Sequence, residues 1–349
     1  MRPVLLATNH APPERVAAFA ALHEREGIEV ALYGGALRHG VAQAGAPLTF
    51  PARRASQRGV HALAASGRYR AVVGSLAGRV APLAAALGAD RARVPFLLWT
   101  ALWAHPRSAA HALSYVPTRW LYGHADAVLA YGPHVAAYAR GQGARNVHVA
   151  PQAVDVAFWS APADAPRRLA PFQAAFVGRD DPEKGVAVLV EAWRRAALED
   201  AALVLVGPAN TDSPNRGVHA VGPQSAAGVR NFLRGSDVLV VPSLRTATFR
   251  EPWALVVNEA MHQALPIIAS TEVGAAAGGL VRDGRNGLVV PAGDADALAA
   301  ALRRVHDDPG VRHRMGATGA EDVGFYTPEA WAAGVSTALA SVGVSRPPL

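Results

Sequence analysis

The chain has 349 residues, of which 51% are hydrophobic and 17% are charged, and it contains no cysteine. This length is too great for one ordinary core and predicts two domains. The composition excludes a largely disordered chain, and the lack of cysteine excludes disulfides and thiolate metal sites, so we expect a cytoplasmic protein. No apolar run reaches the roughly 18 residues needed to cross a bilayer, and residues 2–7 do not resemble a secretory signal.

The net charge of +7 is unevenly distributed along the chain. Residues 1–160 carry 16 arginines and 7 acidic residues, which gives +9, whereas residues 161–349 carry 18 basic and 20 acidic residues, which gives −2. A basic half predicts a negatively charged partner, which could be a phosphorylated or acidic acceptor, an anionic membrane surface or nucleic acid. An arginine-rich, alanine-rich composition that reflects a GC-rich genome would explain the same imbalance without a partner.

Short apolar runs alternate with helical patterns through the first half of the chain. The first run, at residues 4–7, is followed by a helix that opens at Pro12-Pro13 and runs to about Glu26, and then by a second strand. This alternation predicts a parallel, doubly wound α/β sheet whose ligands lie at the carboxyl ends of its strands. We expect the strands of this half at residues 4–7, 28–33, 71–75, 96–99, 125–130 and 146–151.

A basic segment occurs between the second and third of these strands. It consists of Arg53, Arg54, Arg58 and His61 and leads into a helix with Val60 and Leu63 on its apolar side. Because that side is otherwise mostly alanine, we expect an ordinary amphipathic helix. A basic helix that lies on a membrane is the alternative.

The second half centres on residues 249–261. They follow an apolar run at 238–241, which predicts a buried strand, a loop and then a helix with Pro252 in its first turn. Glu251 would lie at the start of this helix, near N–H groups that favour a diphosphate, and Glu259 two turns inside, about 10 Å further along. Carboxylates at that separation can each accept hydrogen bonds from a vicinal diol, and a nucleotide sugar offers two such diols. The alternative is a helix-capping Glu251 and a solvated Glu259.

This segment resembles the E-x7-E signature of retaining glycosyltransferases of the GT-B fold, in the large family 4 that includes bacterial mannosyl- and glucosyltransferases. The similarity continues in order through residues 264–270, 284–291 and 293–298. The resemblance implies an α/β protein of two Rossmann-like, doubly wound parallel-sheet domains that face each other across a cleft. It also implies a nucleotide-diphospho-sugar as the donor substrate.

A second segment matches the same family. A strand at residues 174–177 runs into Gly178-Arg179 and then, after four residues, into Lys184-Gly185 and a helix at 186–197. This is the family's Gly-Arg-x4-Lys-Gly pattern, whose Arg and Lys hold the diphosphate. Arg offers a planar fork to phosphate oxygens and Lys a compact charge. Lys184 is the only lysine in the chain, which favours this role over an ordinary surface lysine.

The resemblance assigns further residues to the donor. Glu251 would bind the sugar hydroxyls, Glu259 the ribose, and the loop at Gly222 the nucleobase through backbone groups. The full donor-binding set is Gly178, Arg179, Lys184, Gly222, Glu251, Trp253, Ala254, Leu255 and Glu259. The catalytic set is Glu251, Arg179, Lys184 and His105. Related transferases use a histidine after the strand at 96–99, so His105 fits this role with a displaced loop, or it is an ordinary loop histidine.

Several positions depart from the family pattern. Ala254 stands where glycine is usual, and Gln263-Ala264 replaces Cys/Ala-Gly. The residues after the first strand, at 9–12, replace a Gly-Gly loop, and Gln152-Ala153-Val154-Asp155 replaces an Asn-Gly-Val-Asp turn. None of these changes removes a charged contact to the donor.

The sequence therefore predicts a retaining, metal-independent glycosyltransferase that moves a hexose from a nucleotide-diphospho-sugar to an acceptor hydroxyl. We expect a UDP-sugar first and a GDP-sugar second, no tightly bound cofactor, and a lipid, glycan or natural-product acceptor. An anionic or lipid-linked acceptor and a small sugar or natural product are both open. The predicted organisation is an acceptor-binding domain at 1–160, a linker at 161–172, a donor-binding domain at 173–327, and a helix at 328–349 that crosses back to the first domain.

Two alternatives remain open. One is a trehalose-synthase-like enzyme of the same fold. The other is a non-catalytic basic protein that binds a polyanion through residues 1–160, with salt-dependent binding and no affinity for sugar nucleotides. Nucleic acid is not an expected partner of the transferase. Peripheral association with the inner face of a membrane is the further expectation from the basic half.

Overall fold

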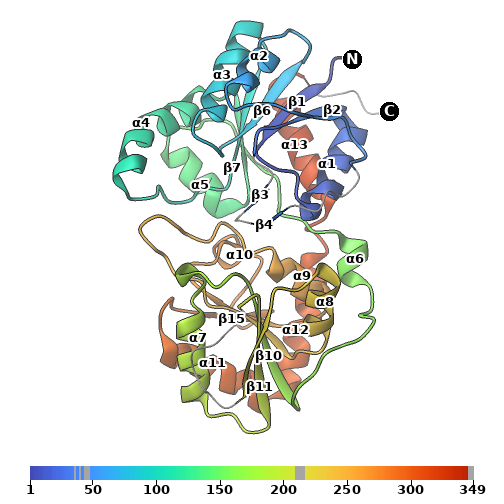
Figure 1. The fold of residues 1–349 in the computed structure, drawn as a ribbon, viewed down its shortest axis with the longest axis vertical. Coiled ribbons are helices and arrows are strands. Elements are labelled where there is room, and N and C mark those ends of the chain that lie inside the picture. The colour runs from blue at the N-terminus through green and yellow to red at the C-terminus, as the bar shows by residue number, and fades with distance from the viewer. Residues whose placement is uncertain (35–36, 39–40, 43–47, 209–216, 345–349) are drawn as a thin grey trace. The chain divides into compact units, whose positions relative to one another are not determined.

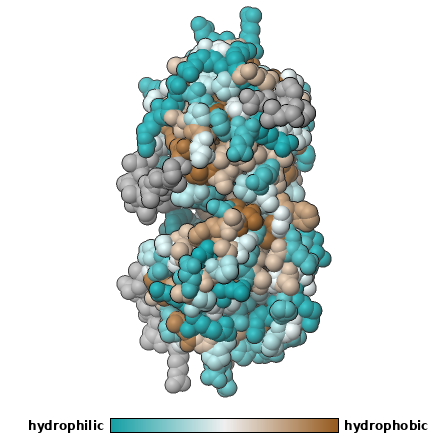
Figure 2. All heavy atoms as spheres, turned by 90° about the vertical axis from the view of Figure 1, so that its right-hand side faces the viewer, coloured by the Kyte–Doolittle hydropathy of each residue, from teal (hydrophilic) through white to brown (hydrophobic). Residues whose placement is uncertain are grey.

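A computed structural model describes residues 1–349 except 35–36, 39–40, 43–47, 209–216 and 345–349, so the last five residues of the predicted crossing segment lie outside it. The chain forms two compact units (Figure 1). Unit 1 comprises Met1–Asp155 and Tyr326–Leu349, and unit 2 comprises Val156–Phe325. Hydrophilic residues cover most of the face drawn in Figure 2. Within the described ranges, every helix is too short or too polar to span a membrane.

Unit 1 is built on a seven-stranded parallel sheet in the order β5-β2-β1-β6-β7-β8-β9. Its strands are β1 (Val4–Thr8), β2 (Ile28–Leu32), β5 (Ala52–Arg54), β6 (Ala71–Ser75), β7 (Phe96–Thr100), β8 (Ala127–Ala130) and β9 (Val147–Val149). The order changes direction between β1 and β6, which is the mark of a doubly wound sheet. A separate antiparallel pair consists of β3 (Leu37–Arg38) and β4 (Val41–Ala42).

Helices cover both faces of this sheet, as its buried apolar strands require. They are α1 (Pro13–Glu26), α2 (Gly59–Ala64), α3 (Ala81–Ala92), α4 (Ala109–His124), α5 (Pro133–Gly141) and α13 (Pro328–Ser341). On one face, Phe19 of α1 and Trp331 of α13 pack against Trp99 of β7, with ring centroids 6.1 and 5.6 Å from that of Trp99. Helix α13 thus belongs to unit 1, although it comes last in the sequence.

Unit 2 is built on a six-stranded parallel sheet in the order β12-β11-β10-β13-β14-β15. Its strands are β10 (Phe172–Val177), β11 (Ala201–Val206), β12 (Val218–Gly222), β13 (Val238–Val241), β14 (Ile267–Ser270) and β15 (Gly287–Val290). Its helical elements are α6 (Val156–Ser160), η1 (Pro182–Lys184), α7 (Val186–Ala196), α8 (Ala226–Arg234), α9 (Val256–His262), α10 (Gly274–Ala277), α11 (Ala295–Asp307) and α12 (Pro309–Val323). The direction of the order changes between β10 and β13.

The fold class expected from the sequence is confirmed in each unit, because both sheets are parallel and doubly wound. The basic segment differs from expectation. Arg53 and Arg54 lie in strand β5, where Arg53 forms an ion pair with Glu29 of β2, and α2 itself contains only His61 of the four basic residues. Helix α2 therefore lacks most of the positive charge that the alternative of a basic membrane-facing helix requires.

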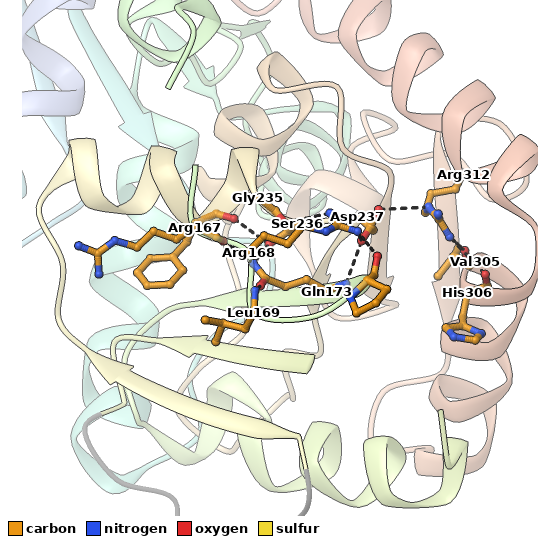
Figure 3. A network of polar contacts seen from close by, with 12 residues as sticks. Arg167, Arg168, Leu169, Gln173, Gly235, Ser236, Asp237, Val305, His306 and Arg312 are labelled. Atoms are coloured by element: carbon orange, nitrogen blue, oxygen red, sulfur yellow. Dashed lines mark hydrogen bonds and ion pairs between the residues drawn. The ribbon is translucent and has the colours of Figure 1, made fainter. Parts of the chain in front are cut away.

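A network of polar contacts lies at the amino ends of β10 and β13 (Figure 3). Asp237 accepts from the backbone N–H of Gln173 at 2.8 Å and pairs with Arg168 at 2.7 Å and Arg312 at 3.5 Å. The Gln173 amide donates to the carbonyl of Arg167 and to the hydroxyl of Ser236. These contacts fasten the segment before β10 to the sheet.

Candidate functional site

The candidate site lies in unit 2 at the carboxyl ends of β10 and β13, where the strand order changes direction. Ligands of doubly wound sheets bind at this place. The chain after β10 carries Arg179 and Lys184, and the chain after β13 carries Ser243 and Glu251. Residues that are 67 positions apart in the sequence thus come from two neighbouring strands of one sheet.

Lys184 and Glu251 form a close ion pair at the centre of this site. Lys184 Nζ lies 2.5 Å from Glu251 Oε2, and the Ser243 hydroxyl donates to the same oxygen at 3.3 Å. Glu251 is only 5% exposed, and the ring of Phe249 lies 5.4 Å from Lys184 Nζ. The two charges compensate each other in a partly buried environment, where an ion pair is screened little by water. Phosphate oxygens would replace a carboxylate oxygen well as partners of this ammonium group.

A glycine makes the approach of the two loops feasible. Gly185 has φ +72°, and a Cβ at this position would lie 2.2 Å from the carbonyl oxygen of Pro242. The backbone N–H of Leu244 donates to the carbonyl of Glu183 at 2.8 Å, which joins the loop after β13 to η1. Since only glycine fits this contact, Gly185 holds Lys184 beside Glu251.

Arg179 lies on the same loop as Lys184 but is occupied by acidic neighbours. Its guanidinium contacts Asp181 at 2.5 Å and Glu183 at 3.9 Å, and its side chain is about half exposed. Arg179 and Lys184 therefore each have a carboxylate partner from a loop. The phosphate oxygens of a ligand would therefore have to replace these carboxylates as the partners of Arg179 and Lys184.

The ends of β10, β11 and β12 approach each other through glycines. Gly178 follows β10, and a Cβ on Gly207, after β11, would lie 1.8 Å from the Gly178 carbonyl oxygen. The Gly207 N–H donates to the carbonyl of Gly222 at 2.9 Å. The predicted positions Gly178 and Gly222 are thus linked through Gly207, which the sequence analysis did not single out as a site residue.

The segment at 249–262 differs from the prediction. Helix α9 begins at Val256, so Pro252 is not in its first turn, and Glu259 lies in the first turn of the helix rather than two turns inside it. Before α9, Glu251 forms an isolated bridge with Val273, and its carbonyl accepts from Gly274 at 3.1 Å. This pairing places Glu251 in a β-bridge, and residues 252–255 after it form a bend and a turn where the Pro252 signal predicts a helix.

Three other predicted donor contacts lie in this stretch. The Trp253 side chain is 2% exposed and donates to Asn258 Oδ1 at 2.8 Å, so its ring belongs to the core of unit 2. Ala254 has φ +69°, and Leu255 is the N-cap of α9. The usual glycine at position 254 is explained, because this left-handed conformation suits glycine best.

His105 belongs to unit 1, in the loop after β7. Its Nε2 lies 2.7 Å from the carbonyl oxygen of His111, and its ring meets the edge of Tyr115 with centroids 5.0 Å apart. Both partners belong to α4, which the sequence analysis did not predict. The structure thus ties His105 to that helix.

Supporting residues of the site were not singled out from the sequence. The Ser270 hydroxyl donates to the carbonyl of Ser243, which fixes the chain after β13, and Arg250 pairs with Glu272 at 2.5 Å. A signal for Ser243 was present, since it directly follows the apolar run of β13 and Pro242.

The sequence also contains one Asp-x-Asp segment, Asp294-Ala295-Asp296, a pattern that can hold a metal beneath a diphosphate. In the structure Asp294 caps α11 by accepting from the N–H groups of Asp296 and Ala297, and Asp296 pairs with Arg195 at 2.8 Å. Across the part of the chain that the structure describes, no group of three or more histidine or acidic side chains has the arrangement of a metal site.

Comparisons with known proteins identify the domain that carries this site. Residues 171–308 match the family described as "Glycosyl transferases group 1", which confirms the resemblance. The D-inositol 3-phosphate glycosyltransferase of Kribbella flavida is 33% identical over 171 residues, covering 42% of this chain and 38% of that protein. The phosphatidyl-myo-inositol mannosyltransferase of Mycobacterium leprae is 32% identical over 161 residues, covering 43% and 41%. The chain thus spans about two fifths of the length of these relatives.

The fold likeness extends over nearly the whole chain. The crystal structure of HepE from Anabaena in complex with UDP aligns with a TM-score of 0.74 at 17% identity, covering 98% of this chain and all of that one. At this identity the likeness establishes the fold, which is GT-B.

Proposed function

We propose that this chain, whose residues 171–308 form a group 1 glycosyltransferase domain, is a retaining glycosyltransferase that uses a nucleotide-diphospho-sugar and requires no metal. The observation that carries the proposal is the Lys184–Glu251 pair at the switch point of the unit 2 sheet. This is where a doubly wound sheet binds a nucleotide. Unit 2 would bind the donor and unit 1 the acceptor.

The site chemistry supports this reaction. The bond between the anomeric carbon and the diphosphate breaks, and Lys184 and Arg179 stabilise the negative charge that develops on the leaving diphosphate. Glu251 accepts hydrogen bonds from the sugar hydroxyls, and Glu259 from the ribose. The acceptor oxygen attacks on the face from which the diphosphate leaves, and its proton passes to a departing phosphate oxygen. Gly178, Gly222, Trp253, Ala254 and Leu255 offer backbone groups to the donor, and His105 of unit 1 contacts the transferred sugar or the acceptor.

UDP-sugars are the first donor candidates, because HepE binds UDP in a GT-B protein of similar fold. The acceptor is proposed to carry a phosphate, as do the inositol phosphate and the phosphatidylinositol named for the two relatives. The basic character of residues 1–160 is in keeping with such an acceptor. We place the protein in the cytoplasm, with peripheral association with the membrane.

Helix α4 supports that association. Leu113 and Val116 are 83% and 72% exposed, Trp120 is also exposed, and their spacing puts them on one face of the helix. Helix α4 itself contains Arg119 and no acidic residue. An exposed apolar face with a basic neighbour suits an anionic bilayer surface. Leu113→Glu should then reduce sedimentation with phosphatidylglycerol vesicles, whereas Phe325→Glu, which changes an equally exposed residue of unit 2, should not.

The experiment that tests the function is a thermal-shift series with UDP, GDP, dTDP and ADP and their common sugars, followed by turnover of the stabilising donor. We expect one nucleotide series to raise the melting temperature. Lys184→Ala should abolish this shift and lower turnover at least ~100-fold, and the free variant should melt below the wild type because the buried Glu251 loses its charge partner. Arg194→Ala, which removes one positive charge from the surface of α7, is the matched control. Turnover should persist in EDTA.

The open alternatives give different results. A trehalose-synthase-like enzyme would turn over the donor with a free sugar as the acceptor. A basic binding protein would show salt-sensitive stabilisation by polyanions and none by any nucleotide, which would refute the proposal.

A further inference from the structure

Among the residues of unit 1 that the structure describes, two arginines are buried, and their surroundings differ. Arg70, directly before β6, is 6% exposed and is fully accommodated. Its guanidinium pairs with Glu26 at 2.6 Å and donates to the carbonyls of Val344 and Arg2 at 2.8 and 2.7 Å. This arginine has an opposite charge and backbone acceptors, so it is a structural link between chain segments at the amino edge of the sheet.

Arg15, in the first turn of α1, is 7% exposed and lacks such compensation. Its Nη2 donates to the side-chain oxygen of Gln152, and its guanidinium lies over the rings of Trp99 and Tyr131, 5.5 and 5.3 Å from their centroids. Its Nη1 is buried without an acceptor, and among the described residues Arg15 has no carboxylate partner. A full positive charge is thus held by one neutral amide and two aromatic faces.

Such an arrangement is costly without a ligand. A buried charge needs an opposite charge and hydrogen bonds, and aromatic faces supply only part of this. The shortage of hydrogen-bond acceptors extends to the ring beneath Arg15, because Trp99 Nε1 is a second buried donor without an acceptor. An anion bound to Arg15 would supply the missing charge and the missing acceptor together.

The position in the fold is one where ligands bind. Arg15 follows β1, Trp99 lies near the end of β7, Tyr131 follows β8 and Gln152 follows β9, so all four lie at the carboxyl edge of the unit 1 sheet. Gln152 is also the residue that replaces asparagine in the family's turn. Its longer side chain reaches Arg15 and orients the guanidinium.

We propose that Arg15 is the anion-binding residue of unit 1 and binds a phosphate group carried by the acceptor. The assignment rests on the proposed function, because it assumes that unit 1 binds the acceptor. A guanidinium recognises a phosphate through paired N–H···O bonds, for which Arg15 still has a donor to offer. Gln152 acts through Arg15 and is a positioning residue.

The test compares Arg15→Met with Arg70→Met, two equal changes at buried arginines of one unit. Replacing an uncompensated buried charge by an apolar side chain is neutral or stabilising, whereas breaking a satisfied pair is destabilising. We expect Arg15→Met to melt at or above the wild-type temperature and Arg70→Met to melt well below it. Inorganic phosphate and myo-inositol 3-phosphate should stabilise the wild type, and Arg15→Met should weaken this binding at least ~10-fold.

Further arms identify the source of the phosphate and separate this proposal from the proposed function. A response to soluble inositol phosphate indicates a free phosphorylated acceptor, whereas binding only to phosphatidylinositol vesicles, lost in Arg15→Met, indicates a lipid headgroup. Stabilisation by UDP should be the same in Arg15→Met as in the wild type. If UDP does not stabilise the wild type, that result contradicts the proposed donor site and not the assignment of Arg15.

Two results would overturn the assignment. One is a wild type that responds neither to inorganic phosphate, nor to inositol phosphate, nor to phosphatidylinositol vesicles, or a response that disappears in Lys184→Ala and persists in Arg15→Met. The other is Arg15→Met melting as low as Arg70→Met with phosphate binding unchanged. Arg15→Lys, which keeps the charge but loses the planar fork, should retain part of the phosphate binding.

Discussion

The two edges of the unit 2 sheet carry similar side chains in opposite states. At the amino edge, Asp237 is held by two arginines and a backbone N–H, and the polar groups of the Gln173 side chain all have protein partners (Figure 3). At the carboxyl edge, Lys184 and Arg179 meet carboxylates that come from loops. At the amino edge, protein groups satisfy the charges and hydrogen bonds of these side chains. At the carboxyl edge, a phosphate can replace the carboxylate partners of the two cations. Charge alone therefore does not mark the site.

The largest effect on stability is expected from Asp237→Ala. The change leaves Arg168, Arg312 and the Gln173 N–H without their shared acceptor, so the free energy of unfolding should fall by about 3 kcal/mol. Urea unfolding measures this loss, and titration of the folded variant with the stabilising nucleotide should give wild-type affinity. Lys184→Ala should differ in losing nucleotide affinity, in addition to the stability lost when the buried Glu251 is left without its charge partner. Equal losses of affinity in both variants would mean that the two edges do not differ in role.

The sequence was sufficient for most strands of both sheets because buried parallel strands are short apolar runs, but it missed β5, whose residues are exposed and mostly basic. It failed where tertiary contacts override a local signal. Pro117 lies inside α4, so a residue that normally ends a helix concealed this one. Pro252 indicated a helix start, but Glu251 pairs with Val273 in an isolated bridge and α9 begins only at Val256.

The candidate site was predictable in part. Lys184 and Glu251 each stood out through a motif, but their contact depends on the approach of two loops that Gly185 permits. Arg15 gave no signal, because an arginine in the first turn of a helix is ordinary in sequence. Its burial without a carboxylate appears only when β7, β8 and β9 are placed beside α1.

A second carboxylate of unit 2, Asp322, makes the stability of the amino edge depend on pH. Asp322 of α12 accepts hydrogen bonds from Arg285 at 2.8 and 3.0 Å and from Asn286 at 2.8 Å. Arg285 and Asn286 directly precede β15, so these contacts lie at the amino edge of the sheet. The hydrogen bond from Arg285 is the main cause that holds the pKa of Asp322 below its ordinary value. Arg285 and Asn286 belong to the family-like segment, but their contacts are structural.

Asp322→Asn should therefore destabilise the protein by about 1–2 kcal/mol at pH 7. A carboxylate with a depressed pKa in the folded state contributes stability above its unfolded pKa, about 3.9, and loses it as the pH falls through the folded value. The difference in melting temperature between wild type and variant should be constant from pH 8 to 5 and shrink below pH 4. A difference that grows toward acid would contradict this account, and nucleotide affinity should not change.

The smallest effects come from two alanines in the left-handed conformation, one at each edge. Ala254, at the carboxyl edge, has φ +69°, and Ala264, just before β14 at the amino edge, has φ +57°. Both stand where the family uses glycine. Ala254→Gly and Ala264→Gly should each raise the free energy of unfolding by about 0.5–1 kcal/mol. Glycine adopts this conformation without the strain of a Cβ, and this gain exceeds the cost of glycine's greater entropy in the unfolded chain. Only Ala254→Gly should also alter the KM for the donor, since only that backbone lies beside Glu251. A change in KM of equal size in Ala264→Gly would show that donor affinity responds to the stability of the unit rather than to the carboxyl edge.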